Sequence, residues 1–310
     1  MKKEVLYEIK AIYRDDFRVT GYTFGEGEKA LCIVGSMRGN ENQQLYCCSR
    51  LVARLRQLEE EGRLIPGKQI LVIPCANPYS INTKKRFWCT DNTDINRMFP
   101  GYALGETTQR IAAGVFDAIK GWQYGIQFAS FYMPGTFVPH IRMMDTGYQD
   151  TELACEFGLP YVVVQKPRPF DTATLNYNWQ IWETQAFSLY THETECIDPA
   201  DARQAVDAIL RFLAAQGLSR QKVLAPAVPP VLFREGELHS VISAAGGLLL
   251  PVRWPGDRVR PGDVLGEIVD PCTCTVLETL RVDCSGQVFF LHHAQLISGH
   301  EVAFRILPEG

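Results

Sequence analysis

Short apolar runs alternate with longer amphipathic stretches along most of the chain from residue 31 onward. Apolar runs typical of strands occupy 31–35 and 70–74, and the stretch between them at 41–61 has the spacing of a helix. The alternation continues with a helical pattern at 106–120, strand-like runs at 124–130, 160–164 and 186–190, and an amphipathic helix at 199–215. Strands joined by helical crossovers predict an α/β fold, in which a mostly parallel or mixed sheet is flanked by helices.

The expected sheet also indicates where chemistry should be sought. In open α/β sheets, ligands bind beyond the carboxyl ends of the strands. A functional site is therefore expected in the loops after residues 35, 75 and 130, and in the loop near 190.

The pattern changes in the last quarter of the chain. The segment 225–237 is rich in proline and lacks periodicity, which is typical of a linker. From 238 to 310, short strand-like runs are separated by glycine and proline, as in small β-barrels and sandwiches. We therefore predict an α/β domain at 1–224, a linker at 225–237 and a small β domain at 238–310.

Composition and charge narrow the classes of function. The chain has 310 residues, of which 46% are hydrophobic, so it can bury a large core. A formal charge of −4 gives no clustered cationic excess for nucleic acid, and no run of 18 apolar residues predicts a membrane span. The ten cysteines lie mostly in apolar runs, which favours reduced thiols over a disulfide framework. We expect a cytoplasmic protein that binds neither nucleic acid nor membrane; self-association is left open.

Three segments in order carry a family resemblance: GSMRGNE at 35–41, a long segment at 73–101, and the strand and loop at 124–144. The middle segment is the most specific and contains Asn77, Pro78, Arg86, Asp94, Asn96, Arg97, Phe99, Pro100 and Gly101. In this arrangement the chain resembles the succinylglutamate desuccinylase/aspartoacylase family, whose fold is zinc carboxypeptidase-like. The resemblance implies zinc-dependent hydrolysis of N-acyl bonds.

The end of the chain resembles the biotinyl/lipoyl-type barrel that closes many chains of this family. No lysine follows Lys222, so this domain has no lysine to carry a biotin or lipoyl group. A structural or pocket-covering role is expected instead.

Several arginines are candidates for binding a small carboxylate ligand. Arg97 offers a planar fork to a carboxylate, Asn96 adds a neutral donor, and Arg86 can polarise a carbonyl oxygen. Arg38 and Arg142 are further candidates for the same cationic pocket. The alternative is that these arginines form ordinary surface ion pairs.

The residues at the zinc-ligand positions depart from the family pattern. The resemblance implies His-Gly-x-Glu after the first core strand and Asp-x-His at a later strand end. This chain has Arg38 and Ala129 in place of the two histidines, and retains Glu41. Catalytic zinc needs three protein ligands and an open position, so we predict that the conventional site is empty.

The acid–base position implied by the resemblance is also changed. The family glutamate aligns with Tyr190 in SLYTHETECID, and a short slip in the alignment would bring Glu193 or Glu195 to the same place. These three residues are the candidates for that role.

Two arrangements could replace the conventional zinc site. In the first, His140 in the loop after Ala129, together with His192, Glu195 and Glu41, forms a relocated metal site. In the second, Arg38 extends into the zinc position and pairs with Glu41, which creates a cationic site suited to carboxylates. His140 and His192 also have ordinary interpretations, as a pocket-wall residue and a strand-end residue.

The sequence therefore leaves several functions open. The first is a hydrolase of N-acyl amino acids that works without the standard zinc triad. The second is a non-catalytic carboxylate-binding pseudoenzyme with a sensing or partner-regulating role. A third, metal-free acyl chemistry through Ser130, Cys89 or Tyr190, ranks last because no nucleophile–base pair is visible in the sequence.

Overall fold

The computed structural model describes residues 1–131, 133–222 and 228–309, and divides the chain into two compact units. The first unit comprises Met1–Ser130 and Pro139–Leu232, and the second comprises Phe131–Val138 and Phe233–Gly310. The predicted domain boundary between residues 224 and 225 lies outside the described residues. No helix in the described part of the chain combines the length and apolar character needed to cross a bilayer.

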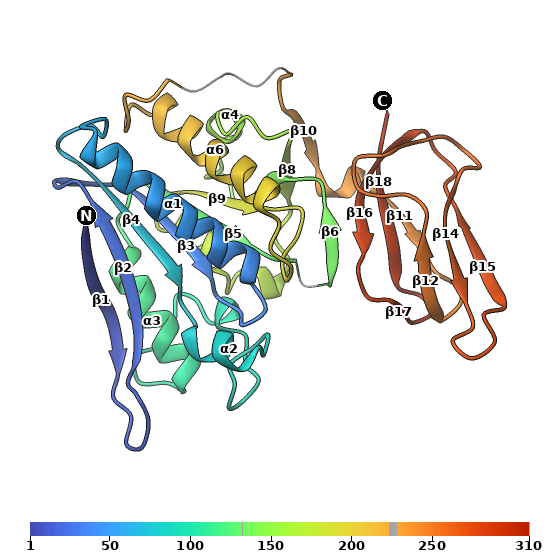
Figure 1. Cartoon of the computed structure of the whole chain (residues 1–310), viewed down its shortest axis with the longest axis horizontal. Helices are drawn as coiled ribbons and strands as arrows, with labels where there is room; N and C mark the ends of the chain where they lie inside the picture. Colours follow the sequence, from blue (N-terminus) through green and yellow to red (C-terminus); the bar gives the residue numbers. More distant parts are fainter. Residues whose placement is uncertain (132, 223–227, 310) are drawn as a thin grey trace. The chain divides into compact units, whose positions relative to one another are not determined.

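The first unit is built on a mixed sheet with helices on both faces, which confirms the predicted fold class (Figure 1). The strands of this sheet, in their order across it, are β1 (Lys2–Ile9), β2 (Phe17–Phe24), β4 (Lys68–Cys75), β3 (Glu28–Ser36), β5 (Tyr124–Ala129), β9 (Gln185–Tyr190), β7 (His140–Met144), β8 (Tyr161–Gln165) and β10 (Val231–Arg234), the last of which includes the boundary between the two units. Its helices are α1 (Asn42–Glu60), α2 (Pro78–Thr83), α3 (Thr107–Ile119), α4 (Thr151–Cys155), α5 (Leu175–Ile181) and α6 (Pro199–Ala215), with short 3-10 turns η1 (Ile95–Arg97) and η2 (Pro169–Asp171).

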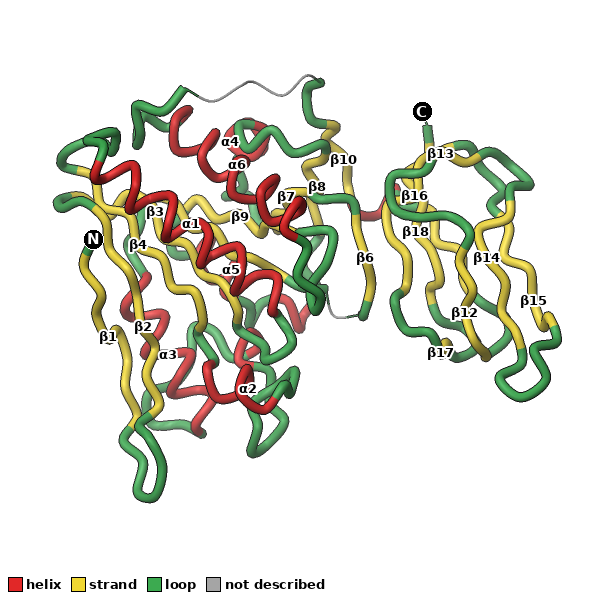
Figure 2. The backbone as a smooth tube through the Cα atoms, viewed as in Figure 1, coloured by secondary structure: helices red, strands yellow, loops and turns green. Residues whose placement is uncertain are grey.

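Burial on both faces explains why the central strands are almost continuously apolar. In β3, Leu31 and Ile33 face a core formed with α1 and α6, whereas Cys32 and Val34 face a second core formed with α3 and α5. Figure 2 shows these helices on either side of the strands. A strand buried on both sides is apolar at most of its positions, and this is the pattern that the sequence displays.

Parallel pairing brings the candidate loops to one edge of the sheet. β3 is parallel to both β4 and β5, and β5 is parallel to β9. The loops after Ser36, Cys75, Ala129 and Tyr190 therefore leave the sheet at the same side.

The segment after β5 differs from the expected loop. His140 begins β7, which runs antiparallel to β9 and parallel to β8. Ile141 and Met143 of this strand are buried in the core with α1 and α6, and this burial favours a strand.

The second unit consists of two antiparallel sheets around one apolar core, as the predicted β-barrel or sandwich requires. Its elements are β6 (Gly135–Phe137), η3 (Glu235–Glu237), β11 (His239–Ile242), β12 (Gly247–Pro251), β13 (Arg258–Val259), β14 (Val264–Val269), β15 (Val276–Arg281), β16 (Gly286–His292), β17 (Leu296–Ile297) and β18 (Val302–Pro308). Strand β6 is distant in sequence from the rest and pairs with β16 through Phe137 and Phe290.

The strand that leads to the candidate site depends on its buried aromatic residue. Phe128 in β5 is fully buried, so Phe128→Ala is expected to destabilise the first unit by about 3–5 kcal/mol through lost burial and a cavity. Urea denaturation followed by tryptophan fluorescence measures this loss. Leu104→Ala is the control, because Leu104 is 84% exposed. Equal urea midpoints of unfolding for Phe128→Ala and Leu104→Ala would contradict the stabilising role of Phe128.

Candidate functional site

The loop after β3 is organised by a buried carboxylate. Glu41 Oε2 accepts hydrogen bonds from the backbone N–H groups of Met37 (2.7 Å) and Arg38 (3.0 Å). The carbonyl oxygen of Arg38 accepts from the Glu41 N–H (3.1 Å) and from the Ser36 hydroxyl (2.8 Å). Glu41, which is only 1% exposed, therefore holds the loop in a closed turn.

Arg38 lies inside this turn and carries a buried positive charge. Its Nη1 donates to Glu41 Oε1 (2.9 Å), and its Nε and Nη2 donate to Asp94 Oδ2 (3.1 and 2.8 Å). Burial opposes the charge of Arg38, but the carboxylates of Asp94 and Glu41 outweigh it and raise its pKa above the usual value. The ion pair between Arg38 and Glu41 suggested by the sequence is thus present, with Asp94 as an additional partner.

The end of β5 completes this cluster. Ser130 Oγ donates to Glu41 Oε1 (2.5 Å) and accepts from Arg38 Nη1 (3.1 Å). Ala129, at the position where the resemblance implies a histidine, is the last residue of β5, and its carbonyl oxygen accepts from Gln44 of α1 (3.4 Å).

Gly39 explains how two loops approach so closely at this point. A Cβ atom at Gly39 would lie 2.1 Å from the carbonyl oxygens of both Lys85 and Ser80. Its N–H donates to the carbonyl oxygen of Arg86 (3.1 Å), which ties the loop after β3 to the segment after α2. A glycine is required here because backbone occupies the space that a side chain would need.

Arg86 lies in the same electrostatic environment. Burial and the neighbouring Arg38 cation lower the pKa of Arg86, while the carboxylates of Glu41, Asp94 and Glu195 act in the opposite direction. A second guanidinium is thus held near the Arg38 cluster.

Arg97 and Arg142 belong to a different network. Arg97 Nη1 donates to Asp171 Oδ1 (3.1 Å) and to the Phe170 carbonyl oxygen (2.9 Å). Asp171 Oδ2 accepts from Gln165 Nε2 (3.0 Å), and Gln165 Oε1 accepts from Arg142 Nη1 (3.1 Å). The two arginines are therefore connected through one carboxylate and one amide.

The aromatic ring of Tyr190 contacts two other candidate site residues, His140 and Arg142. The His140 ring stacks on it, with centroids 4.7 Å apart and planes 8° apart. The Arg142 guanidinium lies over the same ring, 4.9 Å from the centroid. His140 and Tyr190 face each other across paired strands, which accounts for the stacking.

The loop after β9 contains Glu193, Glu195 and His192, and is held by polar residues of α1 and α6. Gln43 Nε2 and the Glu193 N–H both donate to Asp201 Oδ2, at 3.0 and 3.3 Å. The Glu195 carboxylate accepts from Asn40 Nδ2 (2.7 Å), next to the Arg38 turn. Burial raises the pKa of Asp201. Gln43 and Asp201 carry no sequence signal beyond their polar character within helical stretches.

Asn96 serves to link segments. Its Oδ1 accepts from the Leu175 N–H at the start of α5 (3.2 Å), while its own N–H donates to Asp94, which caps η1. The predicted ligand-binding role of Asn96 stays a prediction.

The residues at the family zinc positions do not fit a zinc ion. Arg38 is a cation, Ala129 offers no ligand atom, and Glu41 accepts four hydrogen bonds from Met37, Arg38 and Ser130. Across the described residues, the group of three or more His, Cys, Asp or Glu with converging donor atoms is His239, Asp283 and Cys284 in the second unit. The candidate ligands Glu41, His140 and His192 are not gathered in this way.

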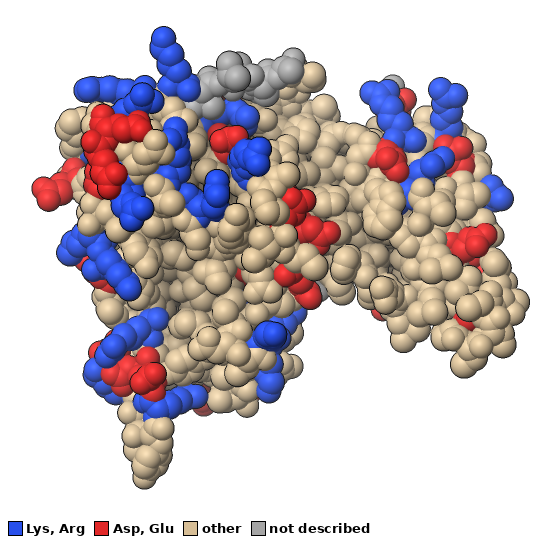
Figure 3. All heavy atoms as spheres, viewed as in Figure 1, with Lys and Arg blue, Asp and Glu red and all other residues tan. Residues whose placement is uncertain are grey.

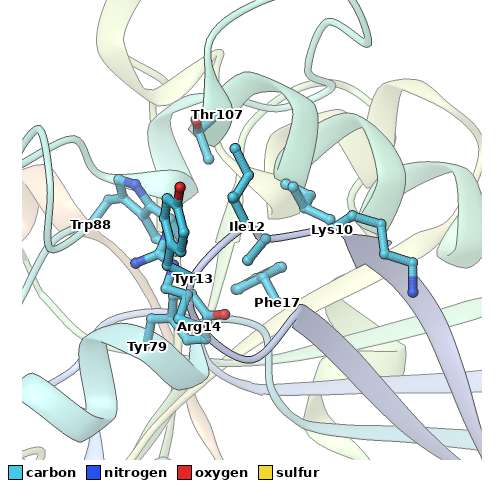
Figure 4. Close-up of a pocket in the computed structure, with 10 residues that line it drawn as sticks. Lys10, Ile12, Tyr13, Arg14, Phe17, Tyr79, Trp88 and Thr107 are labelled. Carbon is cyan, nitrogen blue, oxygen red and sulfur yellow. The ribbon is translucent and has the colours of Figure 1, made fainter.

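A cavity of about 330 Å³ lies elsewhere in the first unit, beside the loop that joins β1 and β2. Figure 4 shows Trp88 and Tyr79 on one side of it and Lys10 on the other. The Arg14 guanidinium lies 4.6 Å from the centroid of Tyr79, which stacks on Trp88 at 5.9 Å. Trp88 itself is 2% exposed, so its main role is in the core.

The face of the molecule drawn in Figure 3 has no large patch of a single charge that would indicate a second binding site. Lys and Arg side chains are interspersed with Asp and Glu in Figure 3. The charges that distinguish the candidate site are the buried ones around Arg38.

Comparisons with known proteins relate the chain to one family. The succinylglutamate desuccinylase/aspartoacylase catalytic domain matches residues 27–126, which include the Arg38 turn and the segment with Asp94. The N-alpha-acetyl-L-2,4-diaminobutyric acid deacetylase of Halomonas elongata is 25% identical over 270 residues, covering 81% of this chain and 73% of the deacetylase.

Solved structures share the fold. A succinylglutamate desuccinylase/aspartoacylase from Rhodobacter sphaeroides superposes with a TM-score of 0.78 at 19% identity, covering 94% of this chain and 89% of that one. The product-bound ectoine utilization protein EutE from Ruegeria pomeroyi gives a TM-score of 0.78 at 16% identity, with the same coverage of 94% and 89%.

The buried cluster predicts a specific stability pattern. Arg38→Met leaves Glu41 and Asp94 without their counter-ion, and is expected to destabilise the first unit by about 3–5 kcal/mol. Adding Glu41→Gln removes one of the two unpaired charges and should restore part of the loss of stability in urea denaturation. Arg18→Met is the control, because its partners Glu8 and Asp16 are at the surface. Losses that simply add in the double variant would argue against coupling between Arg38 and Glu41.

Proposed function

We propose that the chain, whose residues 27–126 match the succinylglutamate desuccinylase/aspartoacylase catalytic domain, is a member of that family that binds an N-acyl amino acid or similar small carboxylate without zinc in the conventional position. In this proposal the chain is a carboxylate-binding relative of the family's hydrolases. The observation that carries it is the buried ion pair between Arg38 and Glu41.

The first step of the argument concerns the metal. Hydrolysis by zinc uses a metal-bound water, and that metal needs three protein ligands. Here the single retained ligand, Glu41, is bonded to the Arg38 side chain and to two backbone N–H groups. A divalent cation at Glu41 would also be repelled by the guanidinium beside it.

The second step concerns the ligand. Arg86 is partly buried and lies near another guanidinium, and these two conditions lower its pKa. A ligand carboxylate beside Arg86 would supply a negative charge that stabilises the guanidinium against both burial and the nearby Arg38. It would also form charge-assisted hydrogen bonds with Arg86. The carboxylate of an N-acyl amino acid, the class of compound named for the Halomonas elongata deacetylase, meets this requirement.

Metal-free chemistry through Ser130 is less well supported. Ser130 donates to Glu41, as a nucleophile would to a base, but Arg38 donates to the same Ser130 Oγ and occupies one of its lone pairs. The hydroxyl thus acts as a link between two charged side chains.

Ligand binding can be tested with Arg86. Isothermal titration with a panel of N-acyl amino acids that includes Nα-acetyl-L-2,4-diaminobutyric acid is expected to show saturable binding. Arg86→Ala should weaken it by about 10- to 100-fold, as expected for loss of a charged hydrogen bond. Arg86→Lys should recover only part of the affinity, since it retains the charge without the fork. Arg50→Ala, an exposed arginine of α1, should bind as the wild type does. Equal affinities for the Arg86 and Arg50 variants would exclude Arg86 from the site.

The metal can be tested independently. Protein dialysed against zinc and then against buffer is expected to carry no zinc that depends on Glu41, so Glu41→Gln should leave the zinc content unchanged. The same preparations should release no acyl group from the panel, whether or not Ser130 is replaced by alanine. Zinc that disappears with Glu41→Gln, accompanied by N-acyl hydrolysis, would show that the conventional site works and would overturn the proposal.

A further inference from the structure

Three metal-ligating side chains converge in the second unit, outside the site described above. His239 is the first residue of β11, and Asp283 and Cys284 lie in the turn between β15 and β16. His239 Nε2 lies 2.9 Å from Asp283 Oδ1, and the donor atoms of all three residues lie within 4.8 Å of one another.

We propose that His239, Asp283 and Cys284 form a binding site for Zn²⁺ or a divalent metal ion with similar ligand preferences. The donor set is one imidazole nitrogen, one carboxylate oxygen and one thiol sulfur, whose proton a bound Zn²⁺ ion would displace; these are ligand types that Zn²⁺ accepts. A thiolate ligand selects against Mg²⁺ and Ca²⁺, which prefer oxygen.

The geometry of the cluster suits a tetrahedral ion. Bond lengths of about 2.0–2.3 Å place the donor atoms of a tetrahedral zinc site roughly 3.3–3.6 Å apart. The His239 and Asp283 donor atoms are 2.9 Å apart and all three donor atoms lie within 4.8 Å of one another, so the side chains would have to adjust to surround an ion. The side chains of His239 and Asp283 are 38% and 75% exposed, so water can reach a fourth position.

The surrounding backbone holds the cluster in place before any ion binds. His239 is paired with Ile306 of β18, and Cys284 packs against the apolar core of the unit. On either side of the turn, the Val282 N–H donates to Asp263 and the Ser285 carbonyl oxygen accepts from Glu309. Ligands carried on fixed elements need little reorganisation on binding.

A bound ion would cross-link β11 to the turn between β15 and β16. Small β units have limited cores, and a structural metal is one of the ways in which such units gain stability. The proposed role is therefore a structural one, independent of ligand binding at Arg86.

The proposal is tested with Co²⁺, which reports thiolate ligation by a charge-transfer absorption band in the near ultraviolet. The full chain, freed of metal with a chelator, is expected to bind one equivalent of Co²⁺ with this band, and Zn²⁺ should displace it. Cys284→Ser should abolish the band. His239→Ala should weaken binding by more than about tenfold, the range seen even for groups that only orient metal ligands.

Matched controls come from the same unit. Cys272→Ser and His293→Gln change an exposed thiol and an exposed imidazole outside the cluster, and both should retain the band and the affinity. Asp283→Asn keeps a hydrogen-bond acceptor for His239 but loses the anionic ligand. It should melt like the wild type without metal and lose most of the rise in melting temperature that Zn²⁺ produces.

Two outcomes would overturn the proposal. Absence of stoichiometric binding and of the band would mean that His239 and Asp283 form only a surface ion pair. A band that survives Cys284→Ser would assign the metal to another thiol. A band lost with Cys284→Ser but unaffected by Glu41→Gln supports the site and leaves the function proposed for the first unit untouched.

Discussion

A buried guanidinium must be compensated by carboxylates, and this constraint shapes the whole edge of the sheet where the parallel strands end. Arg38 takes one carboxylate from its own turn, Glu41, and another from a distant segment, Asp94. Because an unpaired charge in this place would be costly, the turn, the segment after α2 and the end of β5 must adopt positions that satisfy it. Glu41 is therefore explained by the arginine beside it, and its retention need not indicate a metal.

The need to compensate each positive charge also distinguishes Arg86, Arg97 and Arg142, which the sequence alone assigned to one pocket. Arg97 is paired with Asp171, and Arg142 reaches the same aspartate through Gln165. For Arg86, partial burial and the proximity of Arg38 lower the pKa of the guanidinium. The electrostatic environment of Arg86 is the basis for proposing it as the partner of an incoming carboxylate.

The sequence predicted the central elements closely because burial on both faces leaves a strong apolar signal. The helix expected at 199–215 coincides with α6, and the runs at 31–35 and 70–74 lie within β3 and β4. Strands β1 and β2 were not anticipated, since β1 is half exposed and its pattern is weak. The position of His140 in a strand was also missed, because antiparallel pairing with β9 is a property of topology that no local pattern encodes.

The candidate site was predictable only where its partners are close in sequence. Arg38 and Glu41 are three residues apart, so their pairing could be anticipated from the motif itself. The contacts of Arg38 with Asp94, of Arg97 with Asp171 and of Gln43 with Asp201 connect residues far apart in the chain. Such contacts depend on which strand ends are neighbours, and hydrophobic spacing carries no information about that.

Strand β6 makes the second unit depend on two stretches of the chain that are far apart in sequence. Since β6 comes from residues before Pro139, whereas its partner β16 comes near the end of the chain, the unit is assembled from two separate stretches. Its pairing is completed only when the last part has been synthesised. A proteolytic or recombinant fragment restricted to the C-terminal stretch would therefore present an unpaired strand edge beside Phe290, which invites aggregation.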